Sequence, residues 1–388
     1  MTVTAPKGFV AAGVSAGIKE SGAPDLALVA TADGRPVAAA GVFTANKATA
    51  APVQVTRAHL AATGGRAAAV ILNSGNANAA TGEEGRGAAE RMAAAVAAGL
   101  GCEPAHVLVC STGLIGIPLP VERIEAAAPA LLAARSATGG PEAARAILTT
   151  DTRPKEVVVE GAGFTVGGIA KGAAMLAPNM ATMLAVLTTD ATADSATLRS
   201  LLAEAVAGTF NVLSVDGCQS TNDTVLVLAS GAGGTPTPTA DLAAALHDAC
   251  DSLAAQMAGD AEGATKVVQV RVTGARSADD AARGARAIAE SQLCKCSWYG
   301  QDPYWGRIVS ELGSAGIEFD PDRVSVAYGG ITVCRGGVAV SHDEPAVREH
   351  MAQRHLEVVA DLGLGDGSGR VLTNDLTHAY IDENMGTS

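Results

Sequence analysis

Apolar and polar residues alternate in short blocks along the whole chain. Runs rich in Val, Ile and Leu that end in Gly, Asn or Ser predict strands, and Ala-rich runs with charged residues at helical spacing predict helices. The expected strands are 66–72, 106–110, 183–187, 211–215, 225–228, 266–272, 324–328 and 331–334. The expected helices are 85–100, 121–135, 141–148, 195–208, 241–258 and 279–290. This mixture predicts an α/β fold with mixed sheets.

Three polar or Gly-rich connections give local predictions. Gly329-Gly330 separates two strand-like runs and indicates a two-residue hairpin. The turn dipeptide Asp216-Gly217 predicts that 211–215 and 225–228 pair as strands. Residues 161–168 are Gly-rich but lack the GxGxxG spacing, and no helix follows them. They therefore predict a hairpin turn and not a nucleotide site.

Composition narrows the class of protein. With 388 residues, 48% apolar residues and only 3% aromatic residues, the chain can build a large core from Ala, Val, Leu and Ile. The formal charge is 27 − 40 = −13, without a basic cluster, which argues against a nucleic-acid partner. No apolar run is long enough to span a membrane, and the N-terminal segment is too polar for a signal peptide. We expect a cytoplasmic protein.

The seven cysteines indicate reduced thiols and no metal centre. Their number is odd and no CxxC pair occurs. Cys294 and Cys296 would share one face of a strand, but two thiolates do not complete a tetrahedral zinc site. We expect buried core cysteines and neither a metal nor another cofactor.

Two polar segments each allow a structural and a functional interpretation. Ser111-Thr112-Gly113 follows an expected strand, where a hydroxyl and backbone N–H groups could stabilise an oxyanion, although the same sequence is a common turn. The run from Ser220 to Thr224 follows the Asp-Gly turn and could orient a substrate or an active-site threonine. It could equally be part of a hairpin connection.

Thr182 stands where a turn at Pro178-Asn179 leads into an apolar strand-like run. A β-branched residue suits a strand for its shape alone. A threonine with a free α-amino group can also be a nucleophile, because the amine takes the proton of the hydroxyl. Thr182 would gain that amine if its hydroxyl attacked the Ala181 carbonyl and the resulting ester were hydrolysed. Both interpretations remain open from these residues alone.

Several segments together resemble the ornithine acetyltransferase (glutamate N-acetyltransferase) family of arginine biosynthesis. The resemblance covers nearly the whole chain and centres on the motif around Thr182. Its segments are 43–44, 51–53, 73–78, 111–113, 149–152, 171–184, 220–224, 262–266, 302–307 and 373–388. The sequence departs from the family pattern at Cys218, Gln292 and Tyr304, and a bulky ring at Tyr304 could narrow a pocket.

The resemblance implies a two-lobed α/β sandwich that two chains form jointly after self-cleavage between Ala181 and Thr182. Residues 1–181 would be the first chain and residues 182–388 the second, and mature particles would hold two copies of each. Thr182 would be the nucleophile, and Thr112 and Gly113 the oxyanion hole. The implied substrate-binding residues are Thr152, Lys171, Thr182, Glu262, Asn384 and a terminal hydroxyl, Ser388 in preference to Thr387.

The implied reaction moves the acetyl group of N2-acetylornithine to glutamate in a ping-pong scheme through an acetyl-Thr182 enzyme. The sequence leaves open whether acetyl-CoA is also a donor, which would make the enzyme bifunctional. One alternative is a related self-processing amidase or aminopeptidase, which would release acetate. A non-catalytic binding protein is the other, and it would remain uncut.

Overall fold

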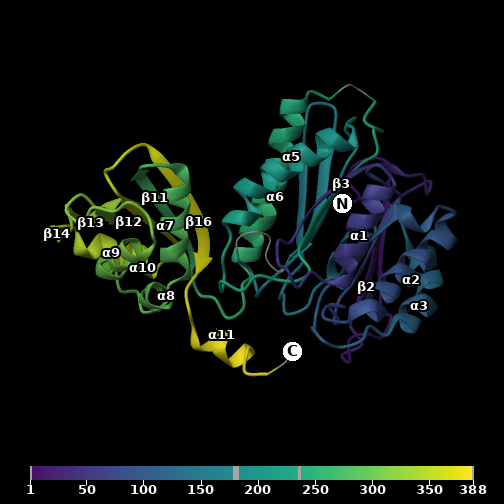
Figure 1. Ribbon diagram of the computed structural model, residues 1–388, viewed down its shortest axis with the longest axis horizontal. Coiled ribbons are helices and arrows are strands. Elements are labelled where there is room, and N and C mark those ends of the chain that lie inside the picture. The colour runs from purple at the N-terminus through teal and green to yellow at the C-terminus, as the bar shows by residue number, and fades with distance from the viewer. Residues whose placement is uncertain (1, 178–182, 235–236, 387–388) are drawn as a thin grey trace. The chain divides into compact units, whose positions relative to one another are not determined.

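The computed structural model describes residues 2–177, 183–234 and 237–386, and these form two compact units (Figure 1). The larger unit holds the described residues of 1–211 and 219–257. The smaller unit holds those of 212–218 and 258–387. Thr182, Ala181, Thr387 and Ser388 lie outside the described residues.

The larger unit contains two sheets with a shared core between them. The first sheet has the order β1-β2-β5-β6, with β1 Phe9–Val14, β2 Leu26–Thr31, β5 Ala69–Asn73 and β6 Val107–Ser111. The second has the order β4-β3-β10-β9-β8-β7, with β3 Val37–Phe43, β4 Arg66–Ala67, β7 Lys155–Glu160, β8 Thr165–Lys171, β9 Leu184–Thr189 and β10 Thr224–Ala229. Residues of both sheets, such as Val70 and Val186, belong to one apolar cluster. Strands such as β2, β9 and β10 are buried along their whole length because both of their faces are covered.

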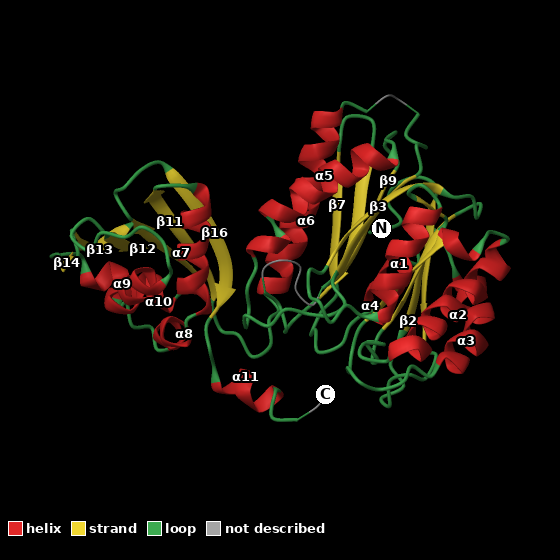
Figure 2. Cartoon of the chain, in the orientation of Figure 1, coloured by secondary structure: helices red, strands yellow, loops and turns green. Residues whose placement is uncertain are grey.

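Helices cover the outer faces of the two sheets (Figure 2). The helices α2 Gly82–Leu100 and α3 Val121–Ala134 bury an Ala, Val, Leu and Met face against the first sheet. The helix α1 Ala51–Ala62 protects the edge strand β6, because the Thr56 hydroxyl bonds both the N–H and the carbonyl of Val109, at 2.8 and 2.7 Å. The helices α5 Ser195–Gly208 and α6 Thr239–Ala258 lie along the second sheet. The short α4 Gly140–Ala146 adds to the core between the sheets. The larger unit is thus an α/β sandwich.

The smaller unit contains the third mixed sheet, with helices around its own core. Its order is β14-β13-β12-β15-β11-β16, with β11 Val267–Ala275, β12 Ser325–Tyr328, β13 Ile331–Arg335, β14 Val338–Ala339, β15 His355–Asp361 and β16 Gly367–Asn374. Its helices are α7 Ala278–Glu290, α8 Gln292–Tyr299, α9 Trp305–Ser314, α10 Glu344–Ala352 and α11 His378–Glu383. Trp298 and Tyr328 are the largest fully buried side chains of this core.

Most of the expected elements are confirmed. All six expected helices are present, within a few residues of the predicted bounds, as α2 to α7. Gly329-Gly330 joins β12 to β13 in an antiparallel hairpin. The Gly-rich stretch 161–168 provides the turn between the antiparallel strands β7 and β8. Among the described residues, no helix has the length and apolar character needed to cross a bilayer.

Two predictions are wrong. Residues 211–215 do not pair with β10, whose neighbours are β3 and β9. They overlap the 3-10 turn Phe210–Val212, and Leu213 bridges to Leu372. The cysteines at 294 and 296 lie on α8 and not on a strand. Because successive helical residues turn through about 100°, Cys294 is buried and Cys296 exposed, and Cys218 is also exposed.

Candidate functional site

The loop after β5 and the bend after β6 lie together at one edge of the first sheet. These two strands are parallel, so their carboxyl ends meet. Asn76 bridges to Thr112 and to Leu114, and the Thr112 N–H donates to the Asn73 carbonyl at 3.0 Å. Thr112 is buried, and its hydroxyl makes no hydrogen bond within the described part of the chain. That hydroxyl is therefore available to a ligand.

Gly113 occupies a position that only glycine can fill. Its φ is +131°, a backbone conformation that residues with a side chain rarely adopt. A Cβ there would lie 2.3 Å from the Gly75 carbonyl carbon and 2.4 Å from the Asn76 nitrogen. The backbone of the 111–113 bend thus packs directly on the backbone of the 73–78 loop, which fixes the direction of its polar groups.

The polar run 219–224 joins this bend to the second sheet. The Asn222 amide donates to the Ala77 carbonyl at 2.6 Å and to the Ser111 carbonyl at 2.9 Å. The Thr44 hydroxyl donates to the Ser220 carbonyl at 2.8 Å, and its N–H donates to the Asp223 carbonyl at 3.0 Å. These bonds explain why the run is not half of a hairpin: its polar groups bind three other segments and hold Asp223 in place.

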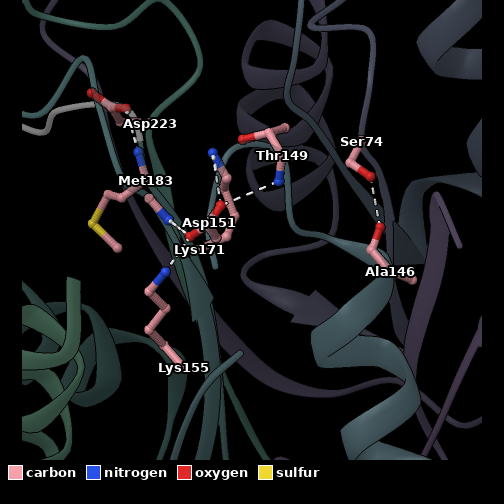
Figure 3. Close-up of polar contacts among 9 residues, drawn as sticks. Ser74, Ala146, Thr149, Asp151, Lys155, Lys171, Met183 and Asp223 are labelled. Carbon is pink, nitrogen blue, oxygen red and sulfur yellow. Dashed lines mark hydrogen bonds and ion pairs between the residues drawn. The ribbon is translucent and has the colours of Figure 1, made fainter. Parts of the chain in front are cut away.

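Asp223 is a fully buried carboxyl beside the residue that follows Thr182 in sequence. Its Oδ1 accepts the Met183 N–H at 2.9 Å (Figure 3). Burial raises the pKa of Asp223 well above its usual range, and the hydrogen bond from Met183 and the charge of Lys171 lower it by less. The hydrogen bond from Met183 places this buried carboxyl next to the segment that follows Thr182 in sequence.

A second buried cluster lies where β7 begins and β8 ends. Lys155 and Lys171 are brought together because the two strands are antiparallel, with Lys155 opposite Ala170. Asp151 lies between them, with its Oδ1 2.5 Å from the Lys155 Nζ and its Oδ2 3.8 Å from the Lys171 Nζ (Figure 3). Its Oδ1 also accepts the Gly172 N–H at 2.7 Å. The side chains of Asp151 and Lys155 are fully buried and that of Lys171 is 3% exposed.

Charge in this cluster favours an anionic ligand. Burial alone would raise the pKa of Asp151, but the two ammonium groups and the hydrogen bonds from Lys155 and Gly172 lower it further, to about 2. Asp151 is therefore an anion at neutral pH and balances one of the two cations. Thr152, the next residue, is exposed. Sequence reasoning selected Lys171 and Thr152 but missed Asp151 and Lys155, although Asp151 stands inside the 149–152 motif.

In the smaller unit the structure brings Glu262 and Asn384 together. The Asn384 amide donates to the Glu262 Oε2 at 2.8 Å, and Glu262 is buried. The helix α11 is held against the 262–263 turn, since the Thr377 hydroxyl donates to the Gly263 carbonyl at 2.8 Å. Gly263 has a φ of +60°, and a Cβ there would lie 2.3 Å from the Tyr380 nitrogen. This close approach fixes the position of Asn384 relative to Glu262.

The three departures from the family pattern lie in the smaller unit. Tyr304 is 54% exposed, and the Arg307 guanidinium lies 5.9 Å from the centre of its ring. Gln292 begins α8, and not a strand, and Cys218 is exposed. Cys218 lies near the Glu262 cluster, because its charge and that of Glu262 both act on Tyr380.

The fold and these clusters define a class of protein. The α/β sandwich offers a fixed bend with polar groups that can stabilise an oxyanion and, in the same unit, buried lysines that can bind a carboxylate. A family model described as the ArgJ family matches residues 10–386, and the chain belongs to this family. It is an acyltransferase of arginine biosynthesis, which confirms the resemblance found in the sequence.

Curated relatives that match over nearly their full length support this assignment. The chain is 50% identical to the arginine biosynthesis bifunctional protein ArgJ of Mycobacterium leprae over 100% of this chain and 95% of the relative. It is 51% identical to the protein of the same name from Mycobacterium tuberculosis H37Rv, over 100% and 96%. A solved structure of the ornithine acetyltransferase of M. tuberculosis in complex with ornithine is 46% identical, with a TM-score of 0.41, over 46% of this chain and 94% of that chain.

Proposed function

We propose that this enzyme transfers the acetyl group of N2-acetylornithine to glutamate through an acetyl-Thr182 intermediate. Thr182 becomes an N-terminal nucleophile when the chain cuts itself between Ala181 and Thr182. The proposal draws on membership of the ArgJ family and on a relative described as an ornithine acetyltransferase in complex with ornithine.

One structural observation carries the proposal. The run 219–224 binds the residue after Thr182 through Asp223, and it binds the Ser111 carbonyl through Asn222. The segment that begins with the proposed nucleophile is thereby tied to the bend that holds the proposed oxyanion donors, Thr112 and Gly113. An acyl-transfer site needs these two parts at fixed positions.

The chemistry follows from these positions. The Thr182 hydroxyl gives its proton to the Thr182 amine and attacks the acetyl carbonyl, and the Thr112 hydroxyl and Gly113 N–H stabilise the oxyanion. The carbon–nitrogen bond then breaks, and ornithine leaves with a proton from the Thr182 ammonium. Glutamate attacks the acetyl ester with its neutral amine, the ester bond breaks, and the Thr182 oxygen regains a proton.

The remaining site residues would bind the two amino acids. Lys171 suits the α-carboxylate common to both substrates, and Glu262 with Asn384 suits an amino group. Thr152 and Ser388 complete the proposed binding set. Use of acetyl-CoA as a second donor would be a separate property. The assembly that the family implies has two copies of the 1–181 chain and two copies of the 182–388 chain.

The first experiment is the intact mass of the purified protein under denaturing conditions, with N-terminal sequencing and an assay with acetylornithine and glutamate. We expect fragments of 181 and 207 residues (388 − 181), the second beginning Thr-Met-Leu-Ala. Thr182→Ala should remain a single chain and form no acetylglutamate, whereas Thr182→Ser keeps a hydroxyl and should still be cut.

Two results would contradict the proposal. An uncut chain of 38.5 kDa that still forms acetylglutamate would exclude Thr182 as an N-terminal nucleophile. A cut enzyme that releases acetate without forming acetylglutamate would be an amidase, since water would then take the acetyl group.

A further inference from the structure

The loop between β1 and β2 is held in place by a buried carboxylate. Asp25 accepts the N–H groups of Ala16, Ile18 and Lys19, at 2.6, 2.5 and 3.0 Å. Its own carbonyl accepts the Ser74 N–H at 2.9 Å. Asp25 therefore fixes the backbone of Lys19 and places it against the 73–78 loop of the candidate site.

Lys19 and the proposed oxyanion bend contact the same residue. The Lys19 Cγ lies 3.1 Å from the point where a Cβ of Gly75 would stand, and the Gly75 carbonyl carbon lies 2.3 Å from the corresponding point at Gly113. Lys19 is half-buried. Within the described residues its Nζ donates only to the Pro24 carbonyl, at 2.9 Å, so two of its three N–H groups remain for a ligand.

The Lys19 ammonium also interacts electrostatically with the cluster around Asp151. Its pKa is lowered, mainly by burial, and the charges of both Lys171 and Asp151 act on it, as does that of Asp25. Asp25, Lys171 and Asp151 act on Lys19, and Lys155 pairs with Asp151, so this group of charges holds three lysines and two aspartates. Their formal charges sum to 3 − 2 = +1, which suits an anionic ligand.

We propose that Lys19 determines specificity for the acetyl acceptor by binding the second carboxylate of a dicarboxylic amino acid. The inference rests on the proposed function. Acetylornithine carries one carboxylate and one ammonium and is neutral overall, whereas glutamate with its attacking amine uncharged carries two negative charges. Lys171 suits the carboxylate that both substrates have, and Lys19 suits the one that only glutamate has.

The experiment compares Lys19→Met with Lys19→Arg and with Lys7→Met in the full, self-processed enzyme. Methionine keeps the length of the stem without the charge, and arginine keeps the charge. Lys7 is an exposed lysine that precedes β1, whereas Lys19 follows the other end of this strand. Lys7→Met therefore changes the net charge of the protein by the same amount, but at a distance from the site. The KM for glutamate and the KM for acetylornithine are measured for each variant.

We expect Lys19→Met to raise the KM for glutamate by about fivefold to tenfold, because the lost ion pair should be stronger than an exposed pair and weaker than a buried one. The kcat and the KM for acetylornithine should each change less than about twofold. Its glutamate KM should also respond less to added salt, because one charge pair is lost. Lys19→Arg should retain most of the affinity, and Lys7→Met should match the unsubstituted enzyme.

An equal rise in both KM values, no change in either, or loss of self-cleavage in Lys19→Met would overturn the assignment of Lys19. The proposed function fails in a different way, because the unsubstituted enzyme would then form no acetylglutamate. The two failures are therefore distinguishable in the same set of measurements.

Discussion

Asp151 makes the stability of the larger unit depend on pH. Its folded-state pKa is about 2, below the usual 3.8, so its ionised form stabilises the fold above pH 4 and this contribution is lost as the pH falls toward 2. The difference of nearly two pKa units corresponds to about 2 kcal/mol. We expect Asp151→Asn to lower the free energy of unfolding by at least this amount at pH 7, because two buried lysines would lose their counter-charge.

Urea unfolding between pH 7 and pH 3 checks this expectation. The difference between Asp151→Asn and the unsubstituted protein should shrink as the pH falls. Asp33→Asn is the control, since Asp33 is an exposed partner of Arg35 at 3.8 Å and should matter little at any pH. A loss of stability that is the same at every pH would mean that shape, and not charge, makes Asp151 necessary.

At this scale the sequence identifies some site residues and leaves out those that act through long-range contacts. Gly113 and Lys171 stand in motifs that can be recognised locally. The link from Asp151 to Lys171 depends on the register of β7 and β8, and the position of Lys19 depends on a contact with Gly75, 56 residues away (75 − 19). No local pattern of residues encodes either contact, so only the folded chain reveals them.

Among the elements, the bend after β6 is the one that the proposed chemistry depends on most. Gly113→Ala would drive a Cβ into the backbone of Gly75 and Asn76 and displace the bend. Loss of one oxyanion donor costs about 100-fold to 1,000-fold in kcat in known enzymes. We expect a loss of kcat of at least that size in Gly113→Ala, measured as acetylglutamate formation.

Gly116→Ala is the matched control for this variant. Gly116 also has a positive φ, +82°, but no atom lies within 4 Å of the position of its Cβ. It should cost about 1 kcal/mol of stability through backbone strain and leave kcat nearly unchanged. A loss of kcat as large in Gly116→Ala as in Gly113→Ala would show that backbone strain, and not the contact with Gly75 and Asn76, makes glycine necessary at 113.

The same contrast between local and long-range information explains which elements the sequence predicts. The helices α2 to α7 follow from Ala-rich periodic runs, because one face of each is buried and the other exposed. The strands β1 and β3 are also rich in Ala and Gly, which have no preference for strands, and they were not among the expected elements. Their pairing with β2 and β10 decides their structure. Residues 211–215 show the opposite: their apolar composition predicts a strand, but they do not pair with β10 and form no named strand.

For the whole molecule, the proposed cut falls inside the larger unit and not between the two units. It separates β8 from β9, which pair over six residues, and β3 from β10, which also pair over six. In the order β4-β3-β10-β9-β8-β7, the two strands after residue 182 are inserted between four strands that precede it. Leu184, Val186 and Leu226 also share one buried cluster with Val70 and Ile169. Each fully buried aliphatic side chain contributes about 1.5–3 kcal/mol, so the association should be very stable.

We therefore expect the two fragments of the cut enzyme to remain together without denaturant. In size-exclusion chromatography they should elute as one species, at the volume of uncut Thr182→Ala, and each peak should yield both fragment masses when it is denatured. Native mass spectrometry should give a multiple of 38.5 kDa and neither fragment alone. Separation of the fragments in native buffer would mean that the interleaved strands do not hold the mature enzyme together, and that the cut chain rearranges into a different sheet order.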